Sequence, residues 1–379
     1  MPPANPSNPE PPPSQGFTCG MLAPGLVRGA LARLVSARQD PAELGRLVDQ
    51  YAQTALAEGA DPRWLFGTLE PPTAGESESG PNGASDAGPR SAPEGGPMLG
   101  QVCMLAASPG RTVGVYVSRD AEPIDLPSSF EGARLSRASR DGRAAQRVAV
   151  VEFARNWLIA RSATGAEPAF DLAQALIEPH HADVREALLR AGFSTLAELG
   201  YMRTEVPRTP QVVPAWPPGV RVTSLASLGW PASTDLLLRA MARSYEGTLD
   251  CPALCGIRRT QDVLASHLAV GAFDPALWFI VFAGDAPEGC MLLTRFDEHE
   301  TAELVYLGLG PPLRGKGLGA SLLSMAMTEL SVRGATALAC AVDGGNEPAL
   351  KLYKAAKFRR FARRVGFIAD VRATGRVHD

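Results

Sequence analysis

The sequence predicts an α/β fold made of two related domains, each with a central sheet flanked by helices. Three observations support this. An apolar strand at 303–309 leads into a glycine-rich loop and then a helix. A strand and a second helix follow, ending at residue 358, and the segment before residue 206 repeats the pattern of the chain's end. Strands that alternate with helices are typical of α/β layers, and self-similarity at a fixed offset indicates duplicated units.

The loop after the first strand has the composition of a pyrophosphate site. Its glycines at 315, 317 and 319 carry no Cβ, so the backbone N–H groups can turn toward one point. The helix that follows adds unsatisfied N–H donors and the positive end of its dipole. Together with the side chains of Arg314 and Lys316, these donors predict that a pyrophosphate binds here.

Two well-known phosphate loops do not fit these residues. The dinucleotide fingerprint G-x-G-x-x-G needs a third glycine at position 320, which is Ala320. The nucleotide P-loop G-x-x-x-x-G-K-[ST] is also not matched by Gly-Leu-Gly-Ala-Ser. The pattern that remains is R-G-x-G-x-G.

The sequence beyond the loop supplies a second motif. Residues 320–333 have a helical apolar stripe that ends at Gly334, and 337–342 reads as a buried strand. A further helix then begins after Asn346, carries Tyr353 and ends at Lys357-Phe358.

The two motifs, in this order, resemble the GNAT superfamily of N-acetyltransferases. The resemblance implies a mixed, largely antiparallel central sheet in each domain and acetyl-CoA as cosubstrate, with no metal. It also implies that CoA contacts come from the end of the strand, the loop and the asparagine: Leu307, Gly308, Leu309, Arg314, Gly315, Lys316, Gly317, Leu318, Gly319 and Asn346. Lys357 departs from the pattern, because the family usually has glycine there.

The resemblance also implies two catalytic roles. Tyr353 is the candidate acid for the CoA thiolate, since a phenol with a pKa of about 10 stays protonated at neutral pH. Glu303, eleven residues before Arg314, is the candidate base, with ordered water as the alternative. Simpler interpretations are a core tyrosine, a solvated glutamate at a strand end and, for Asn346, a helix N-cap.

The acceptor pocket is expected between the first two helices of the active domain. There Glu246 and Asp250 offer carboxylates for an amine cation, and Tyr245 offers a pocket wall. The same residues also fit ordinary turn chemistry.

An internal repeat with an offset of 165 residues places Ala191 on Ala356 and Phe193 on Phe358. The first copy has no chemistry, because Leu188 takes the position of Tyr353 and His181 that of Asn346. Its counterpart of the phosphate loop, expected near 144–148, has no glycine. A degenerate copy followed by an active one resembles the tandem architecture of the mycothiol synthase family.

The predicted domain bounds follow from this repeat. Residues 17–206 form the degenerate domain and 219–375 the catalytic domain, with the proline-rich 207–218 as linker. Residues 1–16 are expected to be a disordered tail. The low-complexity segment 71–97 is expected to be an insertion within the first domain rather than a domain boundary.

Composition and charge exclude several classes of protein. A net charge of −3 and a pI near 6.0 give no reason to expect a nucleic-acid partner. No apolar run reaches the length of a membrane span, and the first residues lack the layout of a signal peptide, so a cytoplasmic location is expected. The six cysteines show no metal spacing and are expected to be free thiols. The adjacent His180 and His181 are expected to be structural or exposed rather than metal ligands.

Two functions fit these residues. The first is acetyl-CoA-dependent N-acetylation of an amine, either a small molecule or a protein, by direct attack on the thioester. The alternative is a non-catalytic regulator that binds acyl-CoA. The sequence names neither the acceptor nor the oligomeric state.

Overall fold

The computed structural model describes residues 16–35, 48–49, 53, 60–71, 98–119, 134–136, 138–210, 212–213, 215–296, 298 and 300–372. The expected tail at 1–16 and the expected insertion at 71–97 lie almost wholly outside these residues. In the described residues, no helix combines the length and apolar character that crossing a membrane requires.

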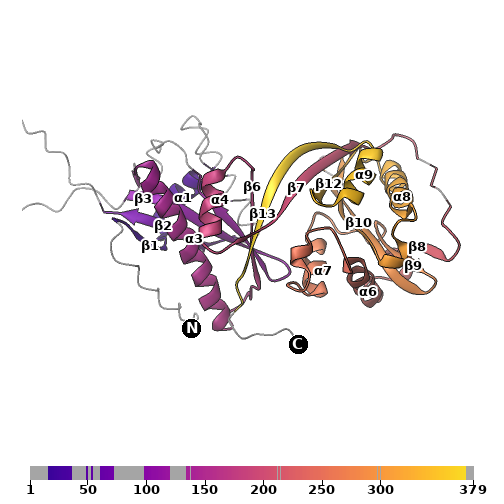
Figure 1. The fold of residues 1–379 in the computed structure, drawn as a ribbon, viewed down its shortest axis with the longest axis horizontal. Coiled ribbons are helices and arrows are strands. Elements are labelled where there is room, and N and C mark those ends of the chain that lie inside the picture. Colours follow the sequence, from indigo (N-terminus) through magenta and orange to yellow (C-terminus); the bar gives the residue numbers. More distant parts are fainter. Residues whose placement is uncertain are drawn as a thin grey trace, which may run out of the picture.

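The N-terminal half contains seven strands and three α-helices among its described residues (Figure 1). In chain order they are β1 (Thr18–Met21), η1 (Pro24–Leu26), α1 (Val27–Val35), β2 (Ala60–Glu70), β3 (Met98–Ser108), β4 (Thr112–Val117), β5 (Arg134–Leu135), α3 (Arg140–Ala163), β6 (Leu172–Ile177), α4 (Ala182–Arg190) and β7 (Ser194–Glu205). The first turn of α3 is capped by Ser139, whose Oγ accepts from Gly142 N at 3.2 Å.

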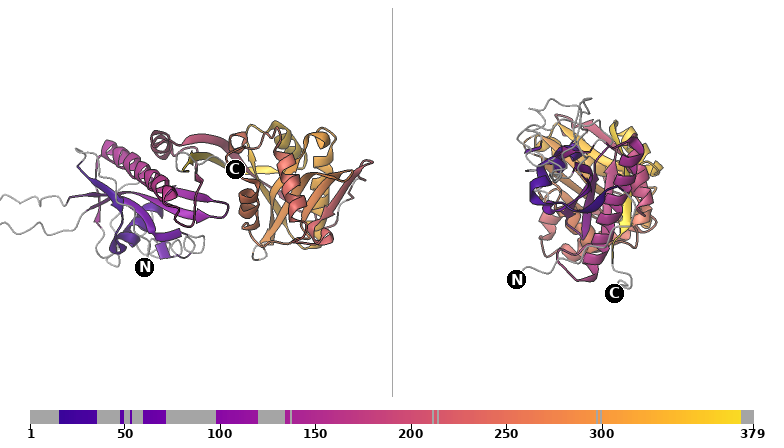
Figure 2. Two further views of the ribbon diagram at one scale, coloured as in Figure 1. Left: turned by 90° about the horizontal axis from the view of Figure 1, so that it is seen from below. Right: turned by 90° about the vertical axis from the view of Figure 1, so that its left-hand side faces the viewer.

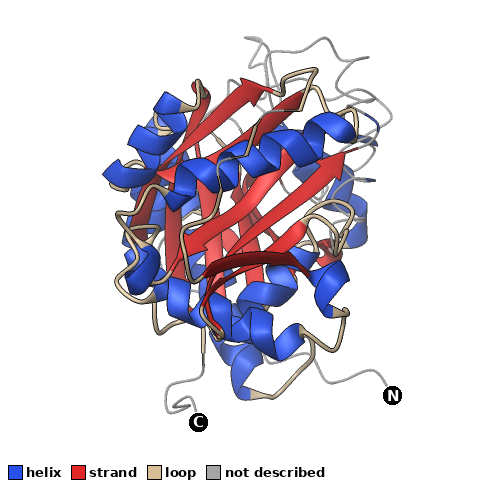
Figure 3. Ribbon diagram, turned by 90° about the vertical axis from the view of Figure 1, so that its right-hand side faces the viewer, coloured by secondary structure: helices blue, strands red, loops and turns tan. Residues whose placement is uncertain are grey.

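The C-terminal half follows the same plan. Its elements are β8 (Val220–Ser224), α5 (Leu225–Leu228), α6 (Thr234–Tyr245), η2 (Pro252–Leu254), α7 (Thr260–Leu268), β9 (Trp278–Ala283), β10 (Ala286–Phe296), β11 (Thr301–Leu309), η4 (Pro311–Leu313), α8 (Leu318–Val332), β12 (Ala337–Asp343), α9 (Glu347–Ala355) and β13 (Arg359–Asp370). Helices cover both faces of the sheet (Figure 3).

The offset of 165 residues is visible in the element bounds. Adding it to the bounds of α4 and β7 gives 347–355 and 359–370, which are the bounds of α9 and β13. The helix ends agree as well. Phe193 N donates to Leu188 O at 3.0 Å, and Phe358 N donates to Tyr353 O at 2.9 Å. Each half therefore has the same closing helix–strand unit, and the tandem α/β fold predicted from the sequence is confirmed.

The two halves exchange their last strands. The sheet order is β1-β2-β3-β4-β6-β13-β7-β12-β11-β10-β9-β8, so β13 lies against β6 of the first half and β7 lies against β12 of the second. β7 and β13 also pair with each other, antiparallel, between Arg359↔Arg203 and Ile368↔Ser194. These two long strands cross the middle of the elongated molecule (Figures 1 and 2).

The exchange explains the composition of β13. Its first half, Arg-Arg-Phe-Ala-Arg-Arg, is mostly exposed, whereas Val365–Ala369 is buried. Phe367 is fully buried and belongs to the apolar cluster of the N-terminal half, together with Phe66 and Trp157. In return, Met202 of β7 belongs to the cluster of the C-terminal half. Each half therefore completes its core with a strand of the other.

The exchange predicts that Phe367→Ala destabilises the N-terminal core although the residue belongs to the C-terminal repeat. Removing a fully buried phenylalanine should lower the free energy of unfolding by about 3–5 kcal/mol. Denaturant unfolding, followed by tryptophan fluorescence and far-UV circular dichroism, measures this loss.

Phe361→Ala on the same strand is the matched control, because that side chain is 63% exposed. Its change should stay near ±0.5 kcal/mol, as is usual for surface positions. If tryptophan fluorescence showed that Trp64 and Trp157 of Phe367→Ala keep their native environment up to the wild-type midpoint of unfolding, β13 would not complete the N-terminal core.

Candidate active site

A cavity of about 240 Å³ lies where β11 separates from β12. The two strands run parallel and pair only at Thr301↔Ala337, Ala302↔Leu338 and Glu303↔Ala339. On the other side β11 stays paired with β10 as far as Leu309, with an irregular register between Tyr306 and Leu304. The part of β11 beyond Glu303 therefore has an edge that no strand occupies, and this edge faces the cavity.

The cavity brings together residues that are far apart in the sequence. Its walls come from the end of α6, the segment after it, the end of β11, the glycine loop and α9. The lining residues are Ser244, Gly247, Thr248, Leu249, Asp250, Tyr306, Leu307, Gly308, Leu309, Arg314, Gly319, Asn346, Pro348, Ala349, Leu352 and Tyr353. Eight of them were expected at the site from the sequence.

The glycine loop forms an open N-terminus for α8. Gly315 and Gly317 have φ values of +73° and +76°, which favour glycine, and Gly317 is the N-cap residue. Among the backbone hydrogen bonds of the described residues, the first donors at this helix end are Ala320 and Ser321, both to Gly317 O. The N–H groups of residues 315–319 are thus free for an anion, as a pyrophosphate site requires.

Three further loop residues have distinct places. A Cβ at Gly319 would lie 3.0 Å from Leu352 Cδ2, so glycine allows α8 to approach α9 closely. Leu318 is buried under the loop in the core of the C-terminal half. Lys316 is exposed at the mouth of the loop.

The guanidinium of Arg314 donates three of its five N–H groups to the protein itself. Its Nε donates to Leu309 O at 2.7 Å, Nη1 to Gly247 O at 3.1 Å and Nη2 to Ser244 O at 2.9 Å. Arg314 therefore ties the phosphate loop to the end of β11 and to the segment after α6. The structure gives this side chain three backbone carbonyls, and the phosphate contact expected from the sequence stays a prediction.

Tyr353 and Asn346 occupy the α9 wall of the cavity. The Tyr353 side chain is 7% exposed, its ring packs on Phe358 at 5.2 Å between centroids, and burial raises the pKa of its hydroxyl. Asn346 caps α9, because its Oδ1 accepts from Ala349 N at 3.3 Å. Its capping role and its place on the cavity wall hold together.

The expected acceptor residues separate in the structure. Asp250 lines the cavity, and burial raises the pKa of its carboxyl, opposed by a hydrogen bond from the Asp343 backbone. Asp343 in turn accepts from Cys251 N at 3.0 Å, which fixes this segment against the end of β12. Glu246 lies outside the cavity wall, where Arg243 Nη1 donates to it at 2.6 Å.

Tyr245 lies behind the cavity in a buried polar cluster. Its ring packs on Tyr306 at 5.3 Å, and the Tyr306 hydroxyl lies 2.8 Å from Ser244 Oγ. His267 also stacks on Tyr306, at 5.6 Å between ring centroids, and burial lowers the pKa of its imidazole to about 4. Sequence reasoning missed Ser244 and Tyr306 because strand alternation assigns Tyr306 to the core rather than to a site.

Glu303 marks the point where β11 and β12 part, but it does not line the cavity. Desolvation raises the pKa of its carboxyl. Burial raises the pKa of the nearby Tyr201 hydroxyl and Cys340 thiol, and the charge of Glu303 adds to this effect. A role for this carboxylate in catalysis therefore needs a path through water.

The corresponding place in the first half is closed. Residues 144–148, the expected counterpart of the loop, lie inside α3, and the helix N-terminus is occupied by Ser139. The buried Arg147 fills the space between β4 and α4, donating to Ser118 O at 2.9 Å and lying 3.3 Å from Asp183. Leu188 and His181 stand where the second half has Tyr353 and Asn346.

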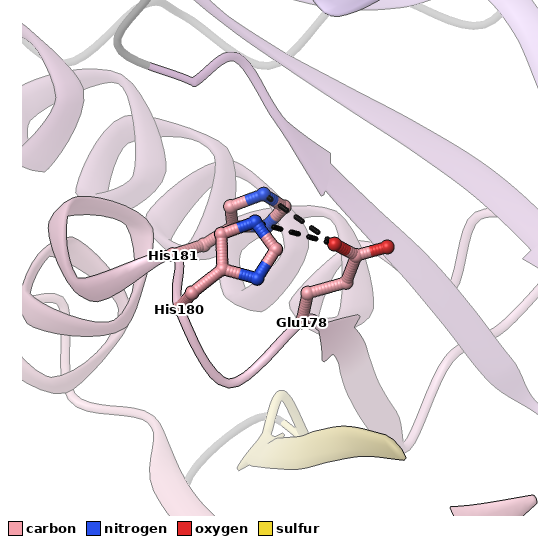
Figure 4. A group of neighbouring side chains, drawn as sticks. All are labelled: Glu178, His180 and His181. Atoms are coloured by element: carbon pink, nitrogen blue, oxygen red, sulfur yellow. Dashed lines mark ion pairs between the residues drawn. The ribbon is translucent and has the colours of Figure 1, made fainter. Parts of the chain in front are cut away.

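Glu178, His180 and His181 form the one group among the described residues with the spacing of metal ligands (Figure 4). Their donor atoms lie within 4.8 Å of one another. However, Arg364 lies 3.2 Å from Glu178, and Arg119 lies 3.3 Å from His181 Nε2. Burial lowers the pKa of His181, and the positive charge of Arg119 lowers it further. These guanidinium charges oppose a divalent cation, and the absence of a metal stays a prediction.

Comparison with known proteins agrees with this geometry. Residues 250–358 match the acetyltransferase (GNAT) family. A mycothiol acetyltransferase of Rhodococcus erythropolis is 32% identical over 109 residues, which are 27% of this chain and 36% of that protein. One of Streptomyces scabiei is 25% identical over 175 residues, 46% of this chain and 54% of that protein. The matches thus span about a third to a half of these relatives.

The fold has a solved counterpart along almost its whole length. A GCN5-related N-acetyltransferase from Sphaerobacter thermophilus superposes with a TM-score of 0.52 over 95% of this chain and 97% of that one, at 16% identity. The C-terminal half of this chain therefore contains a region that matches the GNAT family, and the fold of the chain resembles that of a solved GCN5-related N-acetyltransferase.

The bonds of Arg314 predict that Arg314→Lys loosens the cavity. A lysine ammonium cannot reach three carbonyls on two segments in the fixed geometry of a guanidinium. The variant should have a lower melting temperature without ligand and a higher Kd for CoA, measured by thermal unfolding and calorimetry.

Lys316→Arg serves as the control, because that side chain is exposed and the change keeps its charge. An unchanged melting temperature and Kd in Arg314→Lys would show that the three carbonyl contacts do not hold the loop.

Proposed function

We propose that this protein is an acetyl-CoA-dependent N-acetyltransferase whose chemistry takes place in the C-terminal domain. The observation that supports it best is the continuity of two features. An open helix N-terminus with free N–H groups at 315–319 adjoins a cavity that contains Tyr353 and Asp250. The first site suits the pyrophosphate of CoA, and the second suits the thioester and its acceptor.

The cavity suits direct transfer from thioester to amine. The neutral amine attacks the thioester carbonyl carbon, a tetrahedral oxyanion forms, and the carbon–sulfur bond then breaks to give the amide and the CoA thiolate. The unpaired edge of β11 at 307–309 offers backbone donors near the carbonyl. Tyr353 stays protonated at neutral pH, because burial raises its pKa, and can give its proton to the thiolate.

Two carboxylates are candidates to take the proton that the amine loses. Asp250 lines the cavity and can meet the amine directly, whereas Glu303 lies outside the lining, at the point where β11 and β12 part. We propose that Asp250 contacts the amine, and that Glu303 acts only through water. Both carboxylates thus have a role, and the direct contact belongs to Asp250.

The relatives and the size of the cavity support a small amine as the acceptor. The relatives are named mycothiol acetyltransferases, so mycothiol-related amines are the first acceptors to test. A volume of about 240 Å³ suits a small amine better than a folded protein surface.

Domain bounds of 17–206 and 219–375 remain part of this proposal, with the exchanged strands crossing between them.

We predict that Tyr353→Phe slows turnover by about 100-fold or more, the usual contribution of a positioned acid. The KM for acetyl-CoA should change less than threefold, because phenylalanine keeps the buried ring. Release of free CoA thiol, measured with an amine panel, gives both values.

Tyr201→Phe is the matched control, since that hydroxyl is half-buried outside the cavity. Equal turnover of Tyr353→Phe and wild type would remove Tyr353 from the mechanism. Tight CoA binding without any turnover by the wild type would instead favour the non-catalytic regulator.

We predict that Asp250→Asn lowers kcat/KM at least tenfold while raising the melting temperature at pH 7. The folded-state pKa of Asp250 is raised, so its contribution to stability is full below the unfolded pKa and is lost as pH rises through the folded pKa. At neutral pH the buried charge is unfavourable, and the isosteric amide removes it.

Glu303→Gln is the comparison variant, because its carboxyl is also desolvated but lies outside the cavity lining. A larger loss of kcat/KM in Glu303→Gln than in Asp250→Asn would overturn the assignment of the direct contact. For the wild type, activity should fall as pH drops through the raised pKa of Asp250, above the usual range of an aspartate.

A further inference from the structure

A second large cavity, of about 1200 Å³, lies at the opposite end of α8 from the glycine loop. It is bounded by the end of β7, the turn between α8 and β12, and the start of β13. The lining residues are Arg203, Thr204, Glu205, Val206, Pro207, Arg208, Ser331, Gly334, Ala335, Thr336, Lys357, Arg359, Arg360 and Phe361. We refer to it as the basic groove.

The groove is far from the site proposed for CoA. Gly317 caps the N-terminus of α8, whereas Ser331 and Gly334 at its C-terminal end line the groove. The fifteen residues of the helix span roughly 22 Å at 1.5 Å per residue. An anion bound in the groove would therefore be separate from the pyrophosphate of CoA.

The charges in the groove are strongly unbalanced. Five lining residues are cationic, namely Arg203, Arg208, Lys357, Arg359 and Arg360, and a single lining residue, Glu205, is acidic. All five cations are exposed, and none has an ion pair with any residue that the structure describes. By contrast, Arg363 and Arg364 on the same strand pair with Glu198 and Glu178. In a chain of net charge −3, this concentration of unpaired cations is local.

The strand pairing sets two of these charges directly against each other. Arg203 and Arg359 are partners in the antiparallel pairing of β7 and β13. Like charges at directly opposite positions destabilise a sheet. An anion between the two guanidinium groups would offset this repulsion. Phosphate suits that place, because each guanidinium presents paired N–H donors.

Lys357 shows a further conformational cost, and the first half of the molecule supplies its internal control. Lys357 ends α9 with φ +63°, in a turn where Lys357 N donates to Lys354 O and Phe358 N to Tyr353 O. The same turn ends α4, but there the residue is Gly192 with φ +82°. A lysine in the left-handed conformation costs about 1 kcal/mol or more relative to glycine. The copy that lines the groove has the strained lysine.

We infer that the basic groove binds a ligand with several linked phosphate groups. A single phosphate would satisfy one or two of the five cations, whereas a chain of phosphates can contact cations of both strands and of the turn after α9. A free polyphosphate and the backbone of a single-stranded oligonucleotide both present this chemistry. Phe361 is 63% exposed beside the groove and offers a ring for a base in the second case.

The test uses the full-length protein saturated with CoA, so that the glycine loop is occupied. Binding of inorganic tripolyphosphate and of a fluorescent thymidine decamer is measured by calorimetry and anisotropy at several salt concentrations. The wild type should bind at least one of the two probes, more weakly as salt increases. No saturable binding of either probe at low salt would overturn the inference.

Arg203→Ala with Arg359→Ala should weaken binding about tenfold or more and make its salt dependence shallower. The control variant, Arg185→Ala with Arg190→Ala, removes two exposed arginines of α4 outside the groove. An equal loss in both double variants would indicate a general charge effect and overturn the inference.

Lys357→Gly provides the measurement that a purely structural role would not move. The variant copies Gly192, so its melting temperature should rise, while its affinity for the probe should fall about two- to fivefold. A higher melting temperature with unchanged affinity would contradict a ligand role for Lys357. Phe361→Ala identifies the source, since it should weaken the decamer and leave tripolyphosphate unaffected.

Discussion

The antiparallel pairing of β7 with β13 is the contact on which the rest of the structure depends. Both strands are the last of their repeats, and each is hydrogen-bonded to a strand of the other repeat as well as to its counterpart. The basic first half of β13 therefore runs beside the end of β7, and its apolar second half enters the N-terminal core. Because each core needs a strand of the other, the two halves are expected to fold as one unit.

The pairing of β7 with β12, the other half of the strand exchange, accounts for the shape of the active site. With β7 on its far side, β12 keeps a strand neighbour along its whole length, although it leaves β11 after Glu303. A strand that parts from a neighbour exposes backbone groups, which need partners elsewhere. The support from β7 lets β11 and β12 diverge without loss of the sheet, and the divergence forms the cavity.

Much of this arrangement was predictable from the sequence, and the limits have physical causes. Glycine positions, helix stripes and the 165-residue offset are local or periodic signals, so they located the phosphate loop, α9 and the duplicated ending. The strand exchange left no signal, because a strand that pairs with β6 needs the same alternation as one that pairs with β12. The bonds of Arg314 were also hidden, since its partners are backbone carbonyls that any residue supplies. Glu303 lies where strand spacing placed it, but the cavity begins only after the strands part.

The difference between the two copies is a difference in how one helix end is satisfied. In the N-terminal copy α3 begins with Ser139, whose hydroxyl accepts a backbone N–H, and the buried Arg147 fills the space beside the strand ends. In the C-terminal copy Gly315 and Gly317 precede α8 and the N–H groups of 315–319 stay open, while Arg314 donates to three backbone carbonyls. A capped helix end gains stability but has no donors left for a ligand. An uncapped end gives up that stability and keeps the donors, which is the condition for binding an anion. The duplicated fold thus contains one end of each kind. The closed copy contributes core and the strand β7, while the open copy keeps the site.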